Sequence, residues 1–330
     1  MSEMEQEQSM KILAVDDEPV FLDILKQNLK QIGYDQVVYC QSAFQALRVL
    51  QDDPGGYDCL LVDIKMPEMD GIELVRQVRK IPQCSSTPIL MLTGMSESQY
   101  VDASFMAGAS DYINKPLNRV ALSARLRSAH ALGLERKRVA VLSSLQMTGQ
   151  GAAAHLRFSD AAQLPDIKGS LELVALKNYA LTLGNLRMLN WRATGFAVVG
   201  ASEFFSACGP SQYMDMMQDV GSVLFDVLKR GRFMLAHAGS GCFVALIGRD
   251  QWSDIDDLES QANALIDPFN DLYQAFSTTS VRLVVGTPQQ NRLLSFQRAD
   301  RPIDMALHSA RQRSADAPQF DQPDYPVTHA

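Results

Sequence analysis

The sequence lacks paired cysteines. Its five cysteines stand apart, none of them forms a CxxC pair, and no histidine lies at the spacing of a zinc ligand. These absences argue against a structural zinc site. Isolated thiols are typical of a reducing compartment, so we expect a cytoplasmic protein. The cysteines are Cys40, Cys59, Cys84, Cys208 and Cys242.

Positive charge and long apolar segments are also scarce. The net charge is -8, the pI is near 5.2 and no broad basic stripe is present, which argues against a DNA-binding surface. No apolar run approaches the ~20 residues that a membrane span requires, so we expect no membrane insertion. The polar, acidic start of the chain, MSEMEQEQSM, lacks the features of a signal peptide.

Length and patterning predict two domains. The chain has 330 residues, of which 46% are hydrophobic and 21% charged, as is typical of globular proteins. We expect a disordered lead over 1–9, a first domain over 10–132, a connecting helix and linker over 133–170, a second domain over 171–314 and a disordered tail over 315–330.

The first domain shows five rounds of an apolar strand followed by a helix. After the first strand, for example, Phe21, Leu22, Leu25 and Leu29 recur at helical spacing. This alternation predicts an α/β fold with a doubly wound, five-stranded parallel sheet and helices on both faces. The predicted strands are KILAV, QVVYC, CLLVD, PILMLT and SDYIN.

Reactive side chains gather at the ends of these strands, where open parallel sheets bind their ligands. A carboxylate there can accept a phosphoryl group under three conditions. Mg²⁺ bridges carboxylate and phosphoryl oxygens, a lysine neutralises the remaining charge, and a hydroxyl donates a hydrogen bond. The residues that supply these groups are Asp16, Asp17, Asp63, Thr93 and Lys115.

Four motifs carry a family resemblance. Each is common alone, since an Asp-Asp pair after a strand is usually a turn or a helix cap. Together and in this order they resemble the receiver domain of two-component response regulators, which is flavodoxin-like, over the first ~125 residues. The motifs are VDDEP at 15–19, LVDIKMPEMDG at 61–71, LTG at 92–94 and DYINKP at 111–116.

The resemblance implies the chemistry of the site. Asp63 would accept the phosphoryl group from a histidine kinase or a phosphotransfer protein, and Lys115 would assist. Asp16 and Asp17 would bind Mg²⁺ together with Asp63, and the backbone carbonyl of Lys65 would be a further ligand.

The resemblance also implies a switch. Thr93 and Tyr112 match the pair whose side chains rearrange on phosphorylation, and the Lys115–Pro116 peptide resembles the family's cis bond. We expect the rearrangement to change dimerisation or the exposure of the second domain.

The last helix of the first domain continues past its edge. The sequence from Asn118 keeps helical character well beyond Leu132 and is interrupted only by Gly133. Its intermittent apolar stripe is consistent with a signalling helix that pairs with a second copy, which would make a homodimer. It is equally consistent with a linker helix that packs on its own domain.

The second domain reads as α+β with a mainly antiparallel sheet. The region from Leu164 to Leu189 is mixed and stays unassigned. After it, a strand at GFAVVGA, a long helix, a hairpin around Gly239-Ser240-Gly241, a helix with Pro268, a strand at VRLVVG and a final helix follow.

This order resembles the GGDEF domain of the diguanylate cyclase family over about 171–313. Gly239, Ser240, Gly241, Cys242 and Phe243 stand where Gly-Gly-Asp/Glu-Glu-Phe would stand. Gly241 and Cys242 thus replace both acids, so the signature is degenerate.

The sequence also differs from the GGDEF family at other positions. The acidic metal positions on the first strand fall on Gly200 and Ser202, and the substrate-base positions fall near Cys208 and Met217. The inhibitory RxxD site is reduced to Arg230, with Phe233 in place of the Asp. Without carboxylates, neither Mg²⁺ nor a triphosphate can be held.

We therefore expect a non-enzymatic output domain that acts by binding a downstream protein. The alternatives are an active diguanylate cyclase, an effector that binds cyclic di-GMP or GTP without turnover, and a DNA-binding regulator, which the acidic charge disfavours. His237 and Cys242 could also form a nucleophilic pair. Cysteines in strands, however, are usually small buried hydrophobes.

Overall fold

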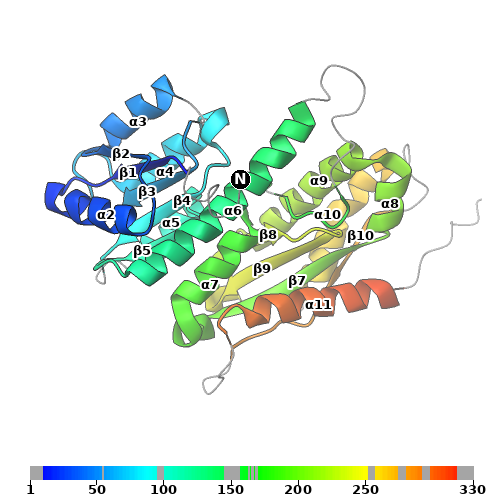
Figure 1. Ribbon diagram of the computed structural model, residues 1–330. Helices are drawn as coiled ribbons and strands as arrows, with labels where there is room; N and C mark the ends of the chain where they lie inside the picture. The colour runs from blue at the N-terminus through cyan, green and yellow to red at the C-terminus, as the bar shows by residue number, and fades with distance from the viewer. Residues whose placement is uncertain are drawn as a thin grey trace, which may run out of the picture. The chain divides into compact units, whose positions relative to one another are not determined.

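The chain divides into two units in this computed structural model, residues 1–148 and residues 149–330, and each contains a five-stranded sheet (Figure 1). The predicted lead and most of the predicted tail lie outside the described residues. The structure describes residues 10–53, 56–94, 100–144, 157–162, 164, 167, 170–251, 257–273, 280–291 and 298–317.

The first unit contains the predicted parallel sheet. Its strands are β1 (Ile12–Val15), β2 (Val37–Cys40), β3 (Cys59–Asp63), β4 (Ile89–Thr93) and β5 (Asp111–Asn114). They lie in the order β2-β1-β3-β4-β5, and every neighbouring pair is parallel. All residues of β1, β3 and β4 are buried, as the continuous apolar runs of strands covered on both faces predict.

Helices cover both faces of this sheet. They are α2 (Pro19–Gln31), α3 (Ala43–Asp52), α4 (Gly71–Arg79), α5 (Val101–Ala107) and α6 (Arg119–Ser144), with a short 3-10 helix at Pro82–Cys84. Leu25 of α2 and Leu122 of α6 share one core cluster, whereas Ala46 of α3 and Leu74 of α4 belong to the other. The α/β prediction, flavodoxin-like and doubly wound, is confirmed.

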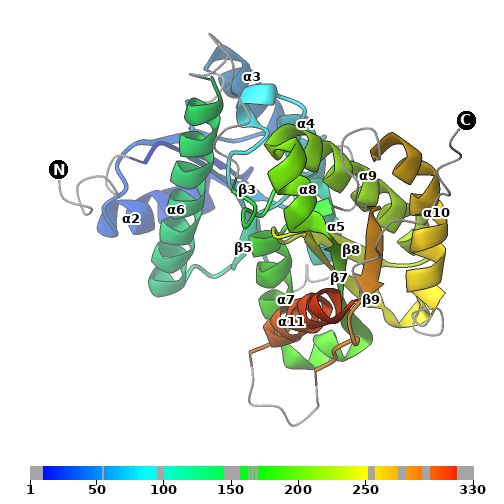
Figure 2. The ribbon, with the colours of Figure 1, turned by 90° about the vertical axis from the view of Figure 1, so that its right-hand side faces the viewer.

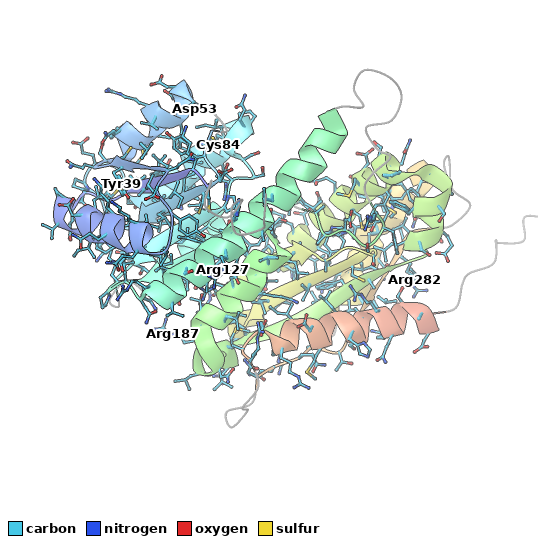
Figure 3. All side chains as sticks on the ribbon, in the orientation of Figure 1. Tyr39, Asp53, Cys84, Arg127, Arg187 and Arg282 are labelled. Atoms are coloured by element: carbon cyan, nitrogen blue, oxygen red, sulfur yellow. The ribbon has the colours of Figure 1, made fainter. Side chains whose placement is uncertain are left out.

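Helix α6 continues through Gly133 without a break. Leu126 is buried in the core of the unit, and Arg125 forms an ion pair with Asp111 at the start of β5. Arg127 lies on the exposed side of the helix (Figure 3). The first half of α6 therefore packs on its own unit. The side chains that would pair with a second copy lie beyond Leu134, outside the described side chains.

The second unit contains a mainly antiparallel sheet, as predicted. Its strands are β6 (Ser170–Glu172), β7 (Trp191–Val199), β8 (Phe233–His237), β9 (Cys242–Gly248) and β10 (Arg282–Val285). The order is β10-β7-β9-β8-β6, and only the β6–β8 pair is parallel among the described strands. Without β6, this is a split β-α-β-β-α-β arrangement.

Helical segments pack around the sheet in the described part of the second unit. They are α7 (Leu173–Arg187), a 3-10 helix at Met188–Asn190, α8 (Ala201–Cys208), α9 (Pro210–Leu228), α10 (Leu258–Tyr273) and α11 (Arg301–Asp316). Figure 2 shows α7 and α11 on one side of the sheet and α9 and α10 on the other. The carbonyl oxygen of Ala306 in α11 approaches β7 so closely that a Cβ at Gly195 would lie 2.2 Å from it.

The region that the pattern left unassigned contains β6 and α7. Helix α7 was hard to recognise because Gly184 breaks it with a φ of 66°, and α8 was not predicted at all. Leu164 and Ile167, which fall in the predicted linker, are buried in the core of the second unit.

No helix in the described part of the chain is long and apolar enough to cross a membrane. All five cysteines are free thiols, and four of them are buried; Cys208 is half-buried.

Candidate functional site

Three charged side chains converge at the carboxyl edge of the first sheet. Asp16 follows β1, Asp63 ends β3 and Lys115 follows β5. The Nζ atom of Lys115 lies 2.7 Å from Oδ2 of Asp16 and 2.5 Å from Oδ1 of Asp63. Although β4 lies between β3 and β5 in the sheet, the side chain of Lys115 reaches both carboxylates, so the structure brings these three predicted residues together.

Lys115 is held over an aromatic ring as well. Its Nζ atom lies 4.0 Å from the centroid of the Phe21 ring, a cation–π contact. Burial lowers the pKa of Lys115, but the hydrogen bonds and negative charges of Asp16 and Asp63 outweigh it, and the net pKa is raised. The lysine is therefore a permanent cation between the two carboxylates.

Asp63 combines burial with nucleophilic potential. Desolvation, helped by the negative charge of Asp16, raises the pKa of Asp63 to about 6. The hydrogen bond and positive charge of Lys115 oppose this rise. The backbone N–H of Lys65 donates to Oδ2 at 2.8 Å and fixes the carboxylate. Above its pKa the carboxylate is ionised and can attack an electrophilic phosphorus.

Gly71 allows the loop after β3 to fold tightly. Its N–H donates to the carbonyl of Ile64 at 2.9 Å. A Cβ at this position would lie 1.9 Å from the carbonyl oxygen of Asp63, so only glycine fits. Asp70 then starts α4 because its side chain accepts a hydrogen bond from the N–H of Glu73 at 2.8 Å.

The donor set fits a hard divalent cation. Asp16 is fully buried and Asp63 is 4% exposed, and their oxygens meet at one point, the Lys115 ammonium. The half-buried Asp17 is next to Asp16 in the same loop. Carboxylates and carbonyls are the ligands that Mg²⁺ prefers. Among the described residues, no three acidic, His or Cys side chains are already gathered around one point as a metal centre.

The predicted switch pair lies on the neighbouring strands β4 and β5. Thr93 is buried, and its Oγ1 donates to the carbonyl of Gly94 at 3.1 Å. Tyr112 is half-buried on β5 and packs against the core cluster of α3 and α4. The Lys115–Pro116 peptide is cis, as the resemblance implied. Residues 95–99, which follow Thr93, lie outside the described residues.

Comparisons with known proteins decide the family of this unit. The model of the response regulator receiver domain matches residues 12–127. Residues 12–127 are a response regulator receiver domain. Receiver domains belong to two-component signalling and are controlled by phosphorylation.

Two relatives are similar in sequence to part of this chain. Transcriptional regulatory protein SpaR of Bacillus subtilis is 38% identical over 118 residues, 36% of this chain and 50% of SpaR. Alkaline phosphatase synthesis transcriptional regulatory protein PhoP of Bacillus subtilis (strain 168) is 33% identical over 156 residues, 47% of this chain and 61% of PhoP. This chain therefore spans only part of the length of both regulators.

A solved receiver domain is among the structures to which part of this chain is similar. It is the receiver domain of a sensor histidine kinase from Pseudomonas aeruginosa PAO1, with a magnesium ion coordinated in its active site cleft. The two are 29% identical, the match covers 37% of this chain and 98% of that chain, and the TM-score is 0.34.

The five residues that we expect to stand in place of the GGDEF signature lie in the β8–β9 hairpin of the second unit. Gly239, Ser240 and Gly241 form the turn between β8 and β9, with φ values of 73°, 53° and 67°. Cys242 and Phe243 begin β9 and are buried. The turn carries no carboxylate, and its Gly241 N–H donates to the hydroxyl of Tyr213 at 2.8 Å.

The other divergent positions are also without acidic ligands. Gly200 is a left-handed residue before α8, and the hydroxyl of the exposed Ser202 donates to Glu203. Met217 is fully buried in the core, where it cannot read a base, and Cys208 is half-buried. Arg230 is exposed after α9, and Phe233 is buried on β8.

Sequence reasoning missed two residues with a role in the receiver site. The apolar stripe of α2 gave Phe21 a core role, and its ring also contacts Lys115. Gly71 was part of a motif, but only the backbone geometry shows its close approach to Asp63. No sequence signal distinguishes either role from ordinary helix packing or a helix start.

Proposed function

We propose that this chain is a phosphorylation-controlled response regulator in which Asp63 accepts the phosphoryl group. The observation that carries the proposal is the pair of ion contacts from Lys115 to the buried Asp16 and Asp63. An oxygen of Asp63 attacks phosphorus, the bond between phosphorus and the donor's histidine nitrogen breaks, and that nitrogen keeps the electron pair. Lys115 neutralises the anion that forms.

Asp16, Asp17 and Asp63, with the carbonyl of Lys65, would hold Mg²⁺. The ion supplies positive charge that screens the attacking carboxylate from the phosphoryl oxygens. The carboxylates orient the site, and the Lys65 N–H holds Asp63 in place. A histidine kinase or phosphotransfer protein is the proposed donor, since receiver domains pair with such phosphodonors. The free thiols fit a reducing, cytoplasmic location.

The proposed output is a degenerate GGDEF-like domain without enzymatic activity that acts by binding a downstream protein. Two observations support this. The sheet order matches the predicted order of elements, with the signature in the central hairpin. The turn Gly239–Gly241 carries no carboxylate at the positions where the GGDEF signature has its acids. Magnesium-assisted chemistry on GTP then lacks its ligands.

An assay of GTP turnover tests the inactive output. Purified protein is activated with beryllofluoride and Mg²⁺, a mimic of the phosphoryl group, and incubated with GTP. We expect no cyclic di-GMP and, in calorimetric titrations, no binding of GTP or cyclic di-GMP. Cyclic di-GMP formation that is lost in Gly239→Ala would contradict the proposal, as would nucleotide binding without turnover.

Light scattering tests whether phosphorylation controls assembly. The mass of the full chain is measured with and without beryllofluoride and Mg²⁺. We expect a change in mass in the wild type and none in Asp63→Asn. If both proteins keep one mass, control through a homodimer is contradicted, and the downstream effect must come from rearrangement within one chain.

A further inference from the structure

A short segment at the start of the second unit lies over the turn of the β8–β9 hairpin. The N–H of Ser240 donates to the carbonyl of Phe158 at 2.7 Å. The N–H of Ala162 donates to Nδ1 of His237 at 3.1 Å. Residues 157–162 are therefore hydrogen-bonded to the end of β8 and to the middle of the turn, and we call them the capping segment.

An aromatic cluster anchors the capping segment. The ring of Phe158 lies 5.7 Å from the ring of Phe205 and 5.7 Å from that of Tyr213, measured between centroids. Tyr213 also accepts the N–H of Gly241 through its hydroxyl. One tyrosine thus contacts the segment with its ring and holds the turn with its oxygen.

The turn is shaped to receive a backbone. A Cβ at Gly239 would lie 2.2 Å from the carbonyl oxygen of Ser159, so any side chain there would displace the segment. Ser240 adopts a left-handed φ of 53°, which is unfavourable for a residue with a side chain. This conformation directs its N–H to Phe158.

The contacts define the kind of peptide that fits this surface. The capping segment closes on itself, because Oδ2 of Asp160 accepts the N–H of Arg157 at 2.9 Å and the N–H of Asp160 donates to the carbonyl of Arg157 at 3.0 Å. The segment shares one backbone–backbone hydrogen bond with Ser240 and donates one to the side chain of His237. Its aromatic ring contacts Phe205 and Tyr213. We therefore expect the surface to bind a tight turn that carries an aromatic residue. Binding would not require a charged side chain of the peptide.

The segment follows the receiver domain along the chain. Helix α6 precedes it, and the ion pair between Arg125 and Asp111 ties α6 to β5. Asp111 is next to Tyr112, one of the two proposed switch residues. A shift of Tyr112 would therefore act on the strand to which α6 is tied.

We propose that the hairpin turn, together with Phe205 and Tyr213, is a peptide-binding surface that residues 157–162 occupy in the resting protein and leave when Asp63 is phosphorylated. The release step rests on the proposed function. A partner protein with an aromatic residue in a tight turn then takes the place of the segment. The surface is the recognition site of the output domain.

Hydrogen exchange measured by mass spectrometry tests occupancy. In Phe158→Ala we expect the amides of Ser240 and Ala162 to exchange about tenfold faster or more, because the two ring contacts of this half-buried side chain are lost. Phe269→Ala is the matched control, since it removes a half-buried ring from the same core outside the surface. Equal effects in both variants would overturn the proposal.

A milder variant keeps the test valid if Phe158→Ala does not fold. Phe158→Leu retains apolar burial and loses the ring contacts, so we expect a smaller rise at the same two amides. Unchanged exchange at Ser240 in a folded Phe158→Leu protein would overturn occupancy of the surface.

Activation tests the release. With beryllofluoride and Mg²⁺, we expect faster exchange at Ser240 and Ala162 in the wild type and no change in Asp63→Asn. If the amides near Lys115 respond while the hairpin does not, release is overturned but the receiver function stands. If neither responds, the proposed function fails, and the Phe158 variants still decide occupancy.

A labelled peptide of residues 157–162 tests recognition directly. We expect it to bind Phe158→Ala and the activated wild type, and to bind the resting wild type at least tenfold more weakly because the surface is occupied. Failure to bind the Phe158→Ala protein would overturn the peptide site. Binding of GTP in place of the peptide would assign the surface to a nucleotide instead.

Discussion

The Nζ atom of Lys115 lies 2.5 Å from Oδ1 of Asp63, and this contact joins the loop after β5 to the end of β3. The same ammonium reaches Asp16 after β1, so three strands of one sheet meet at a single charge. Two buried carboxylates side by side are unfavourable without a cation. Lys115 therefore stabilises the fold and prepares the site for an anionic ligand.

Replacing Lys115 separates these two effects. In Lys115→Met, Asp16 and Asp63 lose their cation, and we expect the free energy of unfolding to fall by about 3 kcal/mol. Mg²⁺ binds these carboxylates only in the folded protein, so we expect added Mg²⁺ to restore part of the lost free energy of unfolding. Urea unfolding with Mg²⁺ and with a chelator measures both. A variant as stable as the wild type in the chelator would contradict the role of the ion contacts.

Two glycines of the first unit predict opposite effects of substitution by alanine. Gly71→Ala places a Cβ 1.9 Å from the Asp63 carbonyl oxygen, so we expect a loss of about 2 kcal/mol and phosphoryl acceptance slowed about tenfold or more. Gly133→Ala meets atoms only at 3.6 Å and lies within α6, so we expect a gain of about 0.5–1 kcal/mol. Thermal unfolding and acceptance rates of both variants check this. If the two substitutions had similar effects, the close approach of Gly71 to Asp63 would not constrain the site.

His237 makes the second unit sensitive to acid. Desolvation lowers its pKa to about 4, against the raising effect of the Ala162 N–H, and Nε2 makes no hydrogen bond within the described residues. Ionisable groups on adjacent elements include Glu172, its register partner on β6, Cys242 on β9, and Arg157 and Asp160 in the capping segment. The histidine is therefore neutral in the folded protein.

The sign of the pH effect follows from this lowered pKa. Between about pH 6.5 and pH 4 the unfolded chain binds a proton that folded His237 does not, so stability falls as the pH falls through this window. The loss from this group approaches about 3 kcal/mol at the lower end. His237→Asn keeps an acceptor near the Nδ1 position and does not titrate. Urea unfolding at pH 7 and pH 5 should show a smaller loss in the variant, and equal losses would refute the assignment.

The hairpin turn predicts that the signature cannot be restored by one substitution. Gly241→Asp meets a φ of 67° and a Cβ contact of 2.4 Å with Ala201, so we expect destabilisation by about 2 kcal/mol and no cyclic di-GMP. Ser240→Gly relieves a left-handed φ and should stabilise by about 1 kcal/mol. Chemical unfolding and a GTP assay measure both variants. Cyclase activity in Gly241→Asp would show that only this acid is missing.

Most of the receiver domain could be predicted from the sequence, and less of the second unit could be. Apolar strands that end in Asp63 or Thr93 are recognisable because parallel sheets bury both faces and present their carboxyl ends to ligands. The ring of Phe21 over Lys115 and the space at Gly71 depend on long-range packing, which has no local signal. Helix α7 was missed because Gly184 interrupts it, and the capping segment was missed because its partners, His237 and Ser240, are far away in sequence.

The central claim is that Asp63 accepts a phosphoryl group, and intact-mass spectrometry of the full chain tests it most directly. The protein is incubated with acetyl phosphate and Mg²⁺. We predict one phosphoryl group on the wild type and on the control Asp70→Asn, which keeps the cap of α4, and none on Asp63→Asn. Equal incorporation in Asp63→Asn, or none in the wild type, would contradict the account.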